Sequence, residues 1–114
     1  MSDCIFCKIA AGEIPADVVY EDDLVIAFRD INPQAPTHVQ IIPREHVARI
    51  ADFDAQRDTA WLAGLFEAAK KIAEQEGLDK GFRLVFNNGA LAGQSVLHVH
   101  MHILGGRGLS WPPG

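Results

Sequence analysis

Three of the five histidines in this chain stand at every second position, at His98, His100 and His102. Apolar residues separate them, as in a half-buried β-strand, so we predict a strand over residues 95–104 with the three imidazoles on one face. At roughly 3.3 Å per residue, the Cα atoms of His98 and His102 lie about 13 Å apart, too far for all three rings to bind one metal ion. The pattern therefore predicts a row of imidazoles and not a metal cage.

A row of imidazoles suits covalent transfer of a phosphoryl group. Unperturbed imidazole has a pKa of about 6.5, so it is largely neutral near pH 7, and one ring nitrogen can attack while a fixed acceptor holds the other. The residues alone leave two other interpretations open: a structural strand whose polar face carries histidines, and metal capture by one His-x-His pair. The metal interpretation leaves one of the three histidines without a role.

Length and composition favour one globular domain spanning residues 1–114, with 48% hydrophobic residues to form a single core. The net charge of −5 and the absence of a Lys/Arg run argue against nucleic acid or an anionic membrane as partner. No apolar run approaches the length of a membrane span, and the N-terminus lacks the pattern of a secretory leader. We therefore expect a soluble, cytoplasmic protein.

The remaining chain predicts an α+β fold: a five-stranded antiparallel sheet with one long helix and a short N-terminal helix. Besides the histidine strand, we expect strands at residues 17–21, 24–29, 37–42 and 81–87. We expect a short helix over residues 4–11. The long helix should begin at Asp54 as N-cap and end at Gly77 as the residue after the C-cap. Two prolines make residues 30–36 a loop, and Gly and Pro residues exclude a helix after residue 104.

Cys4 and Cys7 form a Cys-x-x-Cys pair, which is compatible with half of a zinc site, a redox pair or two unrelated buried thiols. The turn before the histidine strand holds groups that suit a phosphate. Its glycines allow close approach of backbone N–H groups, and its polar residues add side-chain donors. Such turns often serve only as connections. The chain contains no G-x-x-x-x-G-K-[ST] run, which excludes a P-loop NTPase.

The sequence His-Val-His-Met-His-Ile-Leu at residues 98–104 resembles the His-φ-His-φ-His-φ-φ signature of the histidine triad (HIT) superfamily, where φ is apolar. The runs Gly-Gln-Ser-Val at 93–96, Ala-Pro-Thr-His at 35–38 and Trp-Pro-Pro-Gly at 111–114 resemble the Hint branch. The resemblance covers nearly the whole chain. It implies a HIT-like sheet and hydrolysis of purine nucleoside 5′-phosphoramidates to the nucleoside monophosphate through a covalent nucleotidyl-histidine.

The resemblance also implies a two-fold dimer, with the long helix and the strand at 81–87 near the axis and the tail bearing Trp111 reaching the partner's site. It implies five catalytic residues: His100 as nucleophile, His102 and Ser95 at the phosphate and leaving group, His98 as first residue of the motif, and His38 in support. It implies nucleotide contacts from Asp30 at the ribose, from Ile5, Phe6, Ile9, Phe28 and Ile31 around the base, and from Asn87, Gly93, Gln94 and Ser95 at the phosphate. Gln40 departs from the family pattern, which has an apolar residue there.

Resemblance to the related galactose-1-phosphate uridylyltransferases implies a structural zinc ion bound by Cys4, Cys7, His46 and His98, while the covalent reaction needs no cofactor. Two other functions stay open. One is dinucleoside polyphosphate hydrolysis, as in the Fhit branch, although the Trp-Pro-Pro-Gly ending and the Gly-Gln-Ser run favour Hint. The other is a zinc-bearing protein-interaction module with a vestigial nucleotide pocket.

Overall fold

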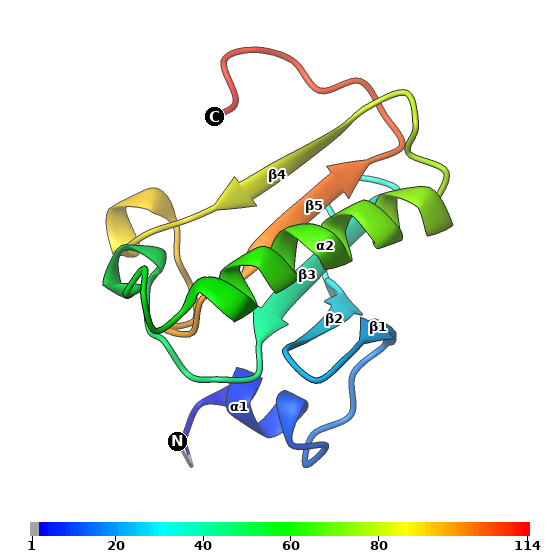
Figure 1. Cartoon of the computed structure of the whole chain (residues 1–114). Helices are drawn as coiled ribbons and strands as arrows, with labels where there is room; N and C mark the ends of the chain where they lie inside the picture. Colours follow the sequence, from blue (N-terminus) through cyan, green and yellow to red (C-terminus); the bar gives the residue numbers. More distant parts are fainter. Residues whose placement is uncertain (1–2) are drawn as a thin grey trace.

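The computed structural model describes residues 3–114 and shows a five-stranded antiparallel sheet with one long helix across one face (Figure 1). The strands are β1 (Val18–Glu21), β2 (Val25–Arg29), β3 (Thr37–Pro43), β4 (Phe82–Phe86) and β5 (Met101–Gly105). The helices are α1 (Ile5–Ala10) and α2 (Thr59–Gln75), with short 3₁₀ turns η1 (Ile50–Asp52) and η2 (Ala90–Ala92). The strand order is β1-β2-β3-β5-β4, which confirms the predicted α+β fold. Neither α-helix of the described chain has the length and apolar character needed to cross a membrane.

Alternation along the strands divides the core between the two faces of the sheet. On one face, the sheet packs against α2 through Val25, Ala27, Val39, Ile41, Met101 and Ile103, which meet Leu65, Ala69 and Ile72 of the helix. On the other face, the α1 residues Phe6 and Ile9 pack against Ile26, Phe28 and Ile42. Fully burying each large side chain stabilises the fold by about 1.5–3 kcal/mol. The histidines therefore lie on the face that α1 covers.

The long helix begins later than we predicted. Asp54 does not cap it: its Oδ1 accepts the backbone N–H groups of Gln56 and Arg57 in a separate turn. Asp58, the residue before Thr59, is fully buried and bonds both the Arg57 guanidinium and the Asp54 N–H. At its other end α2 stops as predicted, since Gly77 adopts a φ of 70° and the next N–H, that of Leu78, donates to Ala73 O.

The histidine strand is shorter than predicted, since β5 starts at Met101 and residues 95–100 lie outside the sheet ladder. On β3, Ile41 is the partner of Met101, so the same register would place Ile42 opposite His100 and Pro43 opposite Val99. Proline has no N–H to donate, and the Val99 N–H instead donates to Val47 O at 2.8 Å. Side chains still alternate, because Val99 is buried in the α2-side core. His98 and His100 thus come from an extended segment that leads into β5.

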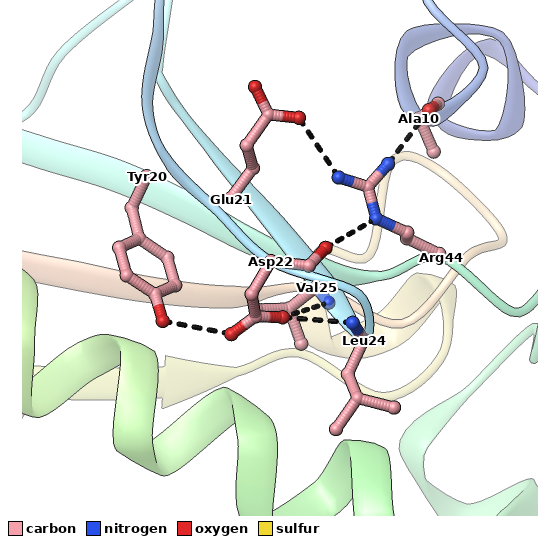
Figure 2. Close-up of polar contacts among 7 residues, drawn as sticks. All are labelled: Ala10, Tyr20, Glu21, Asp22, Leu24, Val25 and Arg44. Atoms are coloured by element: carbon pink, nitrogen blue, oxygen red, sulfur yellow. Dashed lines mark hydrogen bonds and ion pairs between the residues drawn. The ribbon is translucent and has the colours of Figure 1, made fainter.

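Arg44 connects α1 to the β1–β2 hairpin (Figure 2). Its guanidinium donates to the carbonyl of Ala10 at the end of α1, to the carbonyl of Asp22 in the hairpin turn and to the Glu21 carboxylate. The Asp22 carboxylate closes that turn by accepting the N–H groups of Leu24 and Val25 (Figure 2). The short helix that carries both cysteines is therefore held by polar contacts as well as by its apolar face.

Candidate active site

Hydrogen bonding around His100 determines which of its ring nitrogens is free. Nδ1 lies 2.8 Å from the backbone carbonyl oxygen of His98. A carbonyl only accepts, so Nδ1 carries the proton and Nε2 of the neutral ring keeps its lone pair. The ring is 4% exposed and meets the ring of Phe6 edge to face, with centroids 5.2 Å apart. His100 is thus held as the tautomer that a nucleophile attacking through Nε2 requires.

A second chain of hydrogen bonds fixes the tautomer of His102. The backbone N–H of Gln34 donates to His38 Nδ1 at 3.0 Å, so the proton of His38 lies on Nε2. That Nε2 lies 2.9 Å from His102 Nδ1 and 3.4 Å from Asp30 Oδ2. Since His102 Nδ1 accepts a proton, Nε2 of the neutral His102 ring carries its own. His102 therefore offers an N–H donor beside the lone pair of His100, with the two ring centroids 5.0 Å apart.

Burial keeps these imidazoles neutral near pH 7. It lowers the pKa of His102 to about 4, and the neighbouring His100 acts in the same direction. Burial also lowers the pKa of His100 and of His38, with the Asp30 carboxylate opposing the effect in both. Because a charged imidazole loses hydration on burial, the neutral form is favoured at each position. A neutral ring with a free lone pair, His100, and a neutral N–H donor, His102, therefore coexist near pH 7.

A cleft of about 520 Å³, within the size range of small-molecule sites, is lined by Phe6, which contacts the ring of His100, and by Gln40, which pairs with His102 across the sheet. It brings together all of the apolar residues predicted around the base: Ile5, Phe6, Ile9, Phe28 and Ile31. Three of these, Phe6, Ile9 and Phe28, are also core residues, whereas Ile31 is fully exposed. Ile14 and Val96, which the sequence did not single out, complete the apolar wall. Asp30 and Ser95 add polar groups to the same cleft.

The residues predicted at the phosphate do not all have free donors. Ser95 is exposed and lines the cleft, and Gly93 takes the left-handed conformation with a φ of 92°. Gln94 is buried, and its side chain holds the turn: Nε2 donates to the carbonyls of Ala48 and Val96, and Oε1 accepts the Gly89 N–H. Its backbone N–H donates to Gly89 O.

Asn87 is half-buried and directly follows β4. Of the predicted phosphate contacts, Ser95 is therefore the side chain that the fold brings to the cleft, while the Gln94 side chain is already engaged within the protein. The spacing of glycines and polar residues gave no means of telling a ligand donor from a residue that closes the turn.

Cys4, Cys7, His46 and His98 meet in one cluster, with their four ligand atoms within 4.8 Å of one another. Nδ1 of His98 lies 3.4 Å from Cys4 Sγ and 3.5 Å from Cys7 Sγ. Nδ1 of His46 lies 3.3 Å from Cys7 Sγ and 3.2 Å from His98 Nδ1. The Cys-x-x-Cys pair reaches this point because Cys4 caps α1 and Cys7 follows within its first turn.

These distances fit a tetrahedral zinc site. With Zn–S of about 2.3 Å and Zn–N of about 2.0–2.1 Å, a tetrahedron separates sulfur from nitrogen by about 3.5 Å and two nitrogens by about 3.3 Å. The tautomer of His98 fits as well, because its Nε2 lies 2.8 Å from Pro43 O and must donate there. Nδ1 is then left with a lone pair for a metal. A redox pair needs no such convergence of two imidazoles on the two thiols.

The sequence did not identify the three backbone groups that set the tautomers, Gln34 N–H, Pro43 C=O and His98 C=O, because backbone donors and acceptors leave no trace in residue type. It also gave no role to Phe6 against His100, and it assigned no function to Gln40. The phase of β3 places His38 and Gln40 on the same face of the sheet, and this phase was a usable signal for Gln40.

Comparison with known proteins agrees with this architecture. A sequence model described as the HIT domain matches residues 11–109, and the chain therefore belongs to the HIT domain family. A protein of Brassica juncea called 14 kDa zinc-binding protein is 51% identical over 113 residues, covering 98% of this chain and 100% of that protein. An uncharacterized HIT-like protein of Synechococcus elongatus is 53% identical over 112 residues, covering 98% of this chain and 97% of that protein. A HIT family hydrolase from Legionella pneumophila has a crystal structure that matches with a TM-score of 0.95 and 56% identity, covering 98% of this chain and 100% of that chain.

Proposed function

We propose that this protein hydrolyses purine nucleoside 5′-phosphoramidates to nucleoside monophosphates, as in the Hint branch, with His100 as a covalent nucleophile. The observation that carries the proposal is the pair of opposite tautomers: His100 Nδ1 donates to His98 O, while His102 Nδ1 accepts from His38. One ring therefore offers a lone pair and its neighbour offers a proton. In-line substitution at phosphorus uses both.

In the first step His100 Nε2 attacks the α-phosphorus and forms a P–N bond, as the bond from phosphorus to the leaving amine breaks. The amine nitrogen takes a proton from solvent as it leaves, while His102 Nε2–H and the Ser95 hydroxyl donate hydrogen bonds to it and His102 stays neutral. In the second step water attacks the nucleotidyl-histidine, its proton passes to solvent, and the P–N bond to His100 breaks. The nucleoside monophosphate leaves, and His100 returns to its starting tautomer.

The cleft supports a nucleoside as the bound group. Its apolar wall suits a planar base, while the Asp30 carboxylate suits sugar hydroxyls. His38 also holds His102 from the side away from the reacting atom, and Asp30 lies 3.4 Å from His38 Nε2. The relatives called HIT family hydrolases support hydrolysis in general, and the residue motifs of the Hint branch favour a phosphoramidate over a dinucleoside polyphosphate.

We further propose that the cysteine and histidine cluster holds a structural zinc ion and that the covalent reaction itself uses no metal. The name of the Brassica juncea relative and the tetrahedral spacing of the four ligand atoms support the zinc site. Zinc would hold together α1, the segment before β5, and His46, which lies three residues after the end of β3. It would stand apart from the reacting Nε2 atoms, since His98 is the one triad residue in the cluster.

We also propose a two-fold homodimer through the outer side of α2 and β4. A groove of about 640 Å³ runs between these elements and is lined by Phe66, Ala69, Ala73, Phe82 and Leu84 together with polar residues at its rim. Phe66 is 53% exposed and Phe82 is 41% exposed. A second copy of the chain applied to this face would bury both aromatic rings.

The test is turnover of adenosine 5′-phosphoramidate, followed by rapid acid-free quench with labelled nucleotide. Wild type should release AMP and pass through an AMP-histidine adduct that is labile to acid and stable to base. His100→Ala should form no adduct and lose roughly four or more orders of magnitude in kcat/KM. Gln56 is exposed in the turn before α2 and serves as a control, so Gln56→Ala should behave as wild type.

Four outcomes contradict the proposal. Undiminished turnover by His100→Ala excludes His100 as the nucleophile. Strict dependence of turnover on added metal moves the chemistry to a metal-activated water. Release of AMP from diadenosine polyphosphates at a higher kcat/KM than from the phosphoramidate assigns the chain to the other substrate class, and no release from either substrate leaves a protein-interaction role.

A further inference from the structure

Gln40 lies in the centre of the candidate site. On β3 its neighbours across the sheet are Phe28 of β2, at the apolar wall, and His102 of β5, at the reacting end. Its side chain is half-buried and lines the cleft. The position therefore separates the part of the cleft that suits a base from the part that suits a phosphate. In a bound nucleotide the sugar lies between these two parts.

The contact between Gln40 and Asp30 fixes the orientation of both side chains. Gln40 Nε2 lies 2.8 Å from Asp30 Oδ2, and an ionised carboxylate only accepts, so the amide must donate. The other carboxylate oxygen, Oδ1, accepts the backbone N–H of Asn32 at 2.8 Å. Both oxygens of Asp30 are thereby held in place: Oδ2 also lies 3.4 Å from His38 Nε2, and Oδ1 keeps a lone pair for a further donor.

The amide of Gln40 also keeps hydrogen-bonding capacity of its own. Within residues 3–114, Asp30 is the only hydrogen-bond partner of this amide, which leaves one N–H and the carbonyl oxygen Oε1 at the cleft. The hydrogen bond to the Asp30 carboxylate holds the amide in this half-buried position. The amide and the fixed carboxylate together supply one donor and several acceptors at one point.

Neighbouring hydroxyl groups on a sugar match this arrangement. Each hydroxyl has one proton to donate and lone pairs to accept with, so a cis-diol can donate to Asp30 and accept from the Gln40 N–H or donate to Oε1. We propose that Gln40 is a specificity-determining residue that reads the sugar hydroxyls of the nucleotide together with Asp30. This inference rests on the proposed function and assigns to that site a preference for ribonucleotides over 2′-deoxyribonucleotides.

The experiment compares AMP with 2′-deoxy-AMP by isothermal titration calorimetry, and the corresponding 5′-phosphoramidates by kcat and KM. Wild type should prefer the ribonucleotide in both assays. Gln40→Met keeps the length of the side chain without its amide, so the ratio of ribo to deoxy binding constants should fall by roughly 3- to 10-fold. The same ratio of kcat/KM should fall through KM, with kcat for the deoxy substrate within about twofold of wild type.

Two further variants separate recognition from packing. Gln75→Met makes the same replacement on α2, where the amide donates to Val19 O, and should leave the ribo to deoxy ratio at the wild-type value. Gln40→Leu is a second apolar variant, and it should reproduce the lowered ratio if the amide and not the shape of the side chain is responsible. Thermal unfolding of each variant confirms that the folded protein is being compared.

The results distinguish this inference from the proposed function. If the ratio of ribo to deoxy binding constants is unchanged in both Gln40 variants, the role of Gln40 is overturned, whether the binding of both nucleotides weakens equally or not at all. AMP release by wild type would still uphold the reaction. A wild type that binds AMP and 2′-deoxy-AMP equally well also overturns the role of Gln40. A wild type that binds neither nucleotide and turns over neither 5′-phosphoramidate overturns the proposed function and with it this inference.

Discussion

The carbonyl oxygen of Pro43 lies 2.8 Å from Nε2 of His98, so the last residue of β3 fixes the ring that belongs to both the metal-ligand cluster and the histidine triad. The same residue ends the ladder with β5, since proline cannot donate an N–H there. The backbone carbonyl of His98 in turn accepts from His100 Nδ1 at 2.8 Å. The cysteine and histidine cluster and His100 are therefore linked through one residue, His98.

This link leads to a prediction for the metal site. Protein purified without chelator or metal-affinity resin should contain about one zinc per chain, and replacing Cys4 and Cys7 together with Ser should abolish it. The double variant should fold but unfold at a midpoint lower by on the order of 10 °C, because ligand binding adds stability that the variant lacks. Elemental analysis and calorimetry measure the two effects.

Wild type treated with a strong chelator is the matched control, and its midpoint should approach that of the double variant. Stoichiometric zinc in the double variant excludes Cys4 and Cys7 as ligands. A midpoint that does not respond to the chelator or to the substitutions excludes a stabilising role for the metal.

The contact between His38 and His102 predicts a graded effect of substitutions at His38. His38→Ala removes the donor that selects the tautomer of His102, so kcat should fall by about 10- to 100-fold, the usual scale for a supporting hydrogen bond. His38→Gln places an amide N–H near the position of Nε2 and should retain most of the activity. Steady-state kinetics on the phosphoramidate measures both. Equal losses in the two variants would mean that the ring is needed for packing and not for its proton.

Stability should depend on pH through the buried histidines. In the folded state burial lowers the pKa of His102 to about 4, whereas in the unfolded chain it is about 6.5. Above pH 6.5 neither state binds the proton, so the stabilising contribution is complete. As the pH falls from about 6.5 to 4, the unfolded state takes up a proton that the folded state does not, and the free energy of unfolding decreases.

Urea denaturation at several pH values between 4 and 7.5 measures this dependence. His102→Gln has no titrating ring at this position, so its stability should fall less steeply with decreasing pH than that of wild type. The difference in slope, not the absolute stability, is the relevant quantity, since the other buried histidines titrate in both proteins. Parallel pH profiles for the two proteins contradict the assignment.

Periodicity predicted the parts of the fold that depend on one segment at a time. Val99, Met101 and Ile103 alternate with the histidines and are all buried in the α2-side core, as a two-residue period requires. The start of α2 was wrong because Asp54 and Asp58 are both acceptable N-caps, and only the burial of Asp58 against Arg57 selects between them. The length of β5 was wrong because it is limited by its partner strand, through Pro43, and not by its own sequence.

In the candidate site, too, features set by residue type could be predicted, whereas features set by folded backbone groups could not. Residue types identified the histidines and the Cys-x-x-Cys pair, because few other side chains supply a ligand or a nucleophile at neutral pH. The tautomers of His98, His100 and His38 depend on backbone groups of Pro43, His98 and Gln34, which any residue type provides. The Gln94 side chain satisfies backbone groups, and this need becomes visible only when the turn is folded.

The apolar face between α2 and β4 predicts how the oligomeric state responds to substitution. Phe66 is half exposed on α2, where its ring lies 6.5 Å from that of Phe86, and it lines the groove with Phe82 and Leu84. Wild type at micromolar concentration should have the mass of a dimer by light scattering. Phe66→Glu should give a monomer, because a carboxylate buried at a two-fold axis faces its own symmetry mate. Phe53→Glu replaces another exposed phenylalanine outside α2 and β4 and should remain dimeric, so a monomer in both variants would indicate general destabilisation, and a dimer in both would place the interface elsewhere.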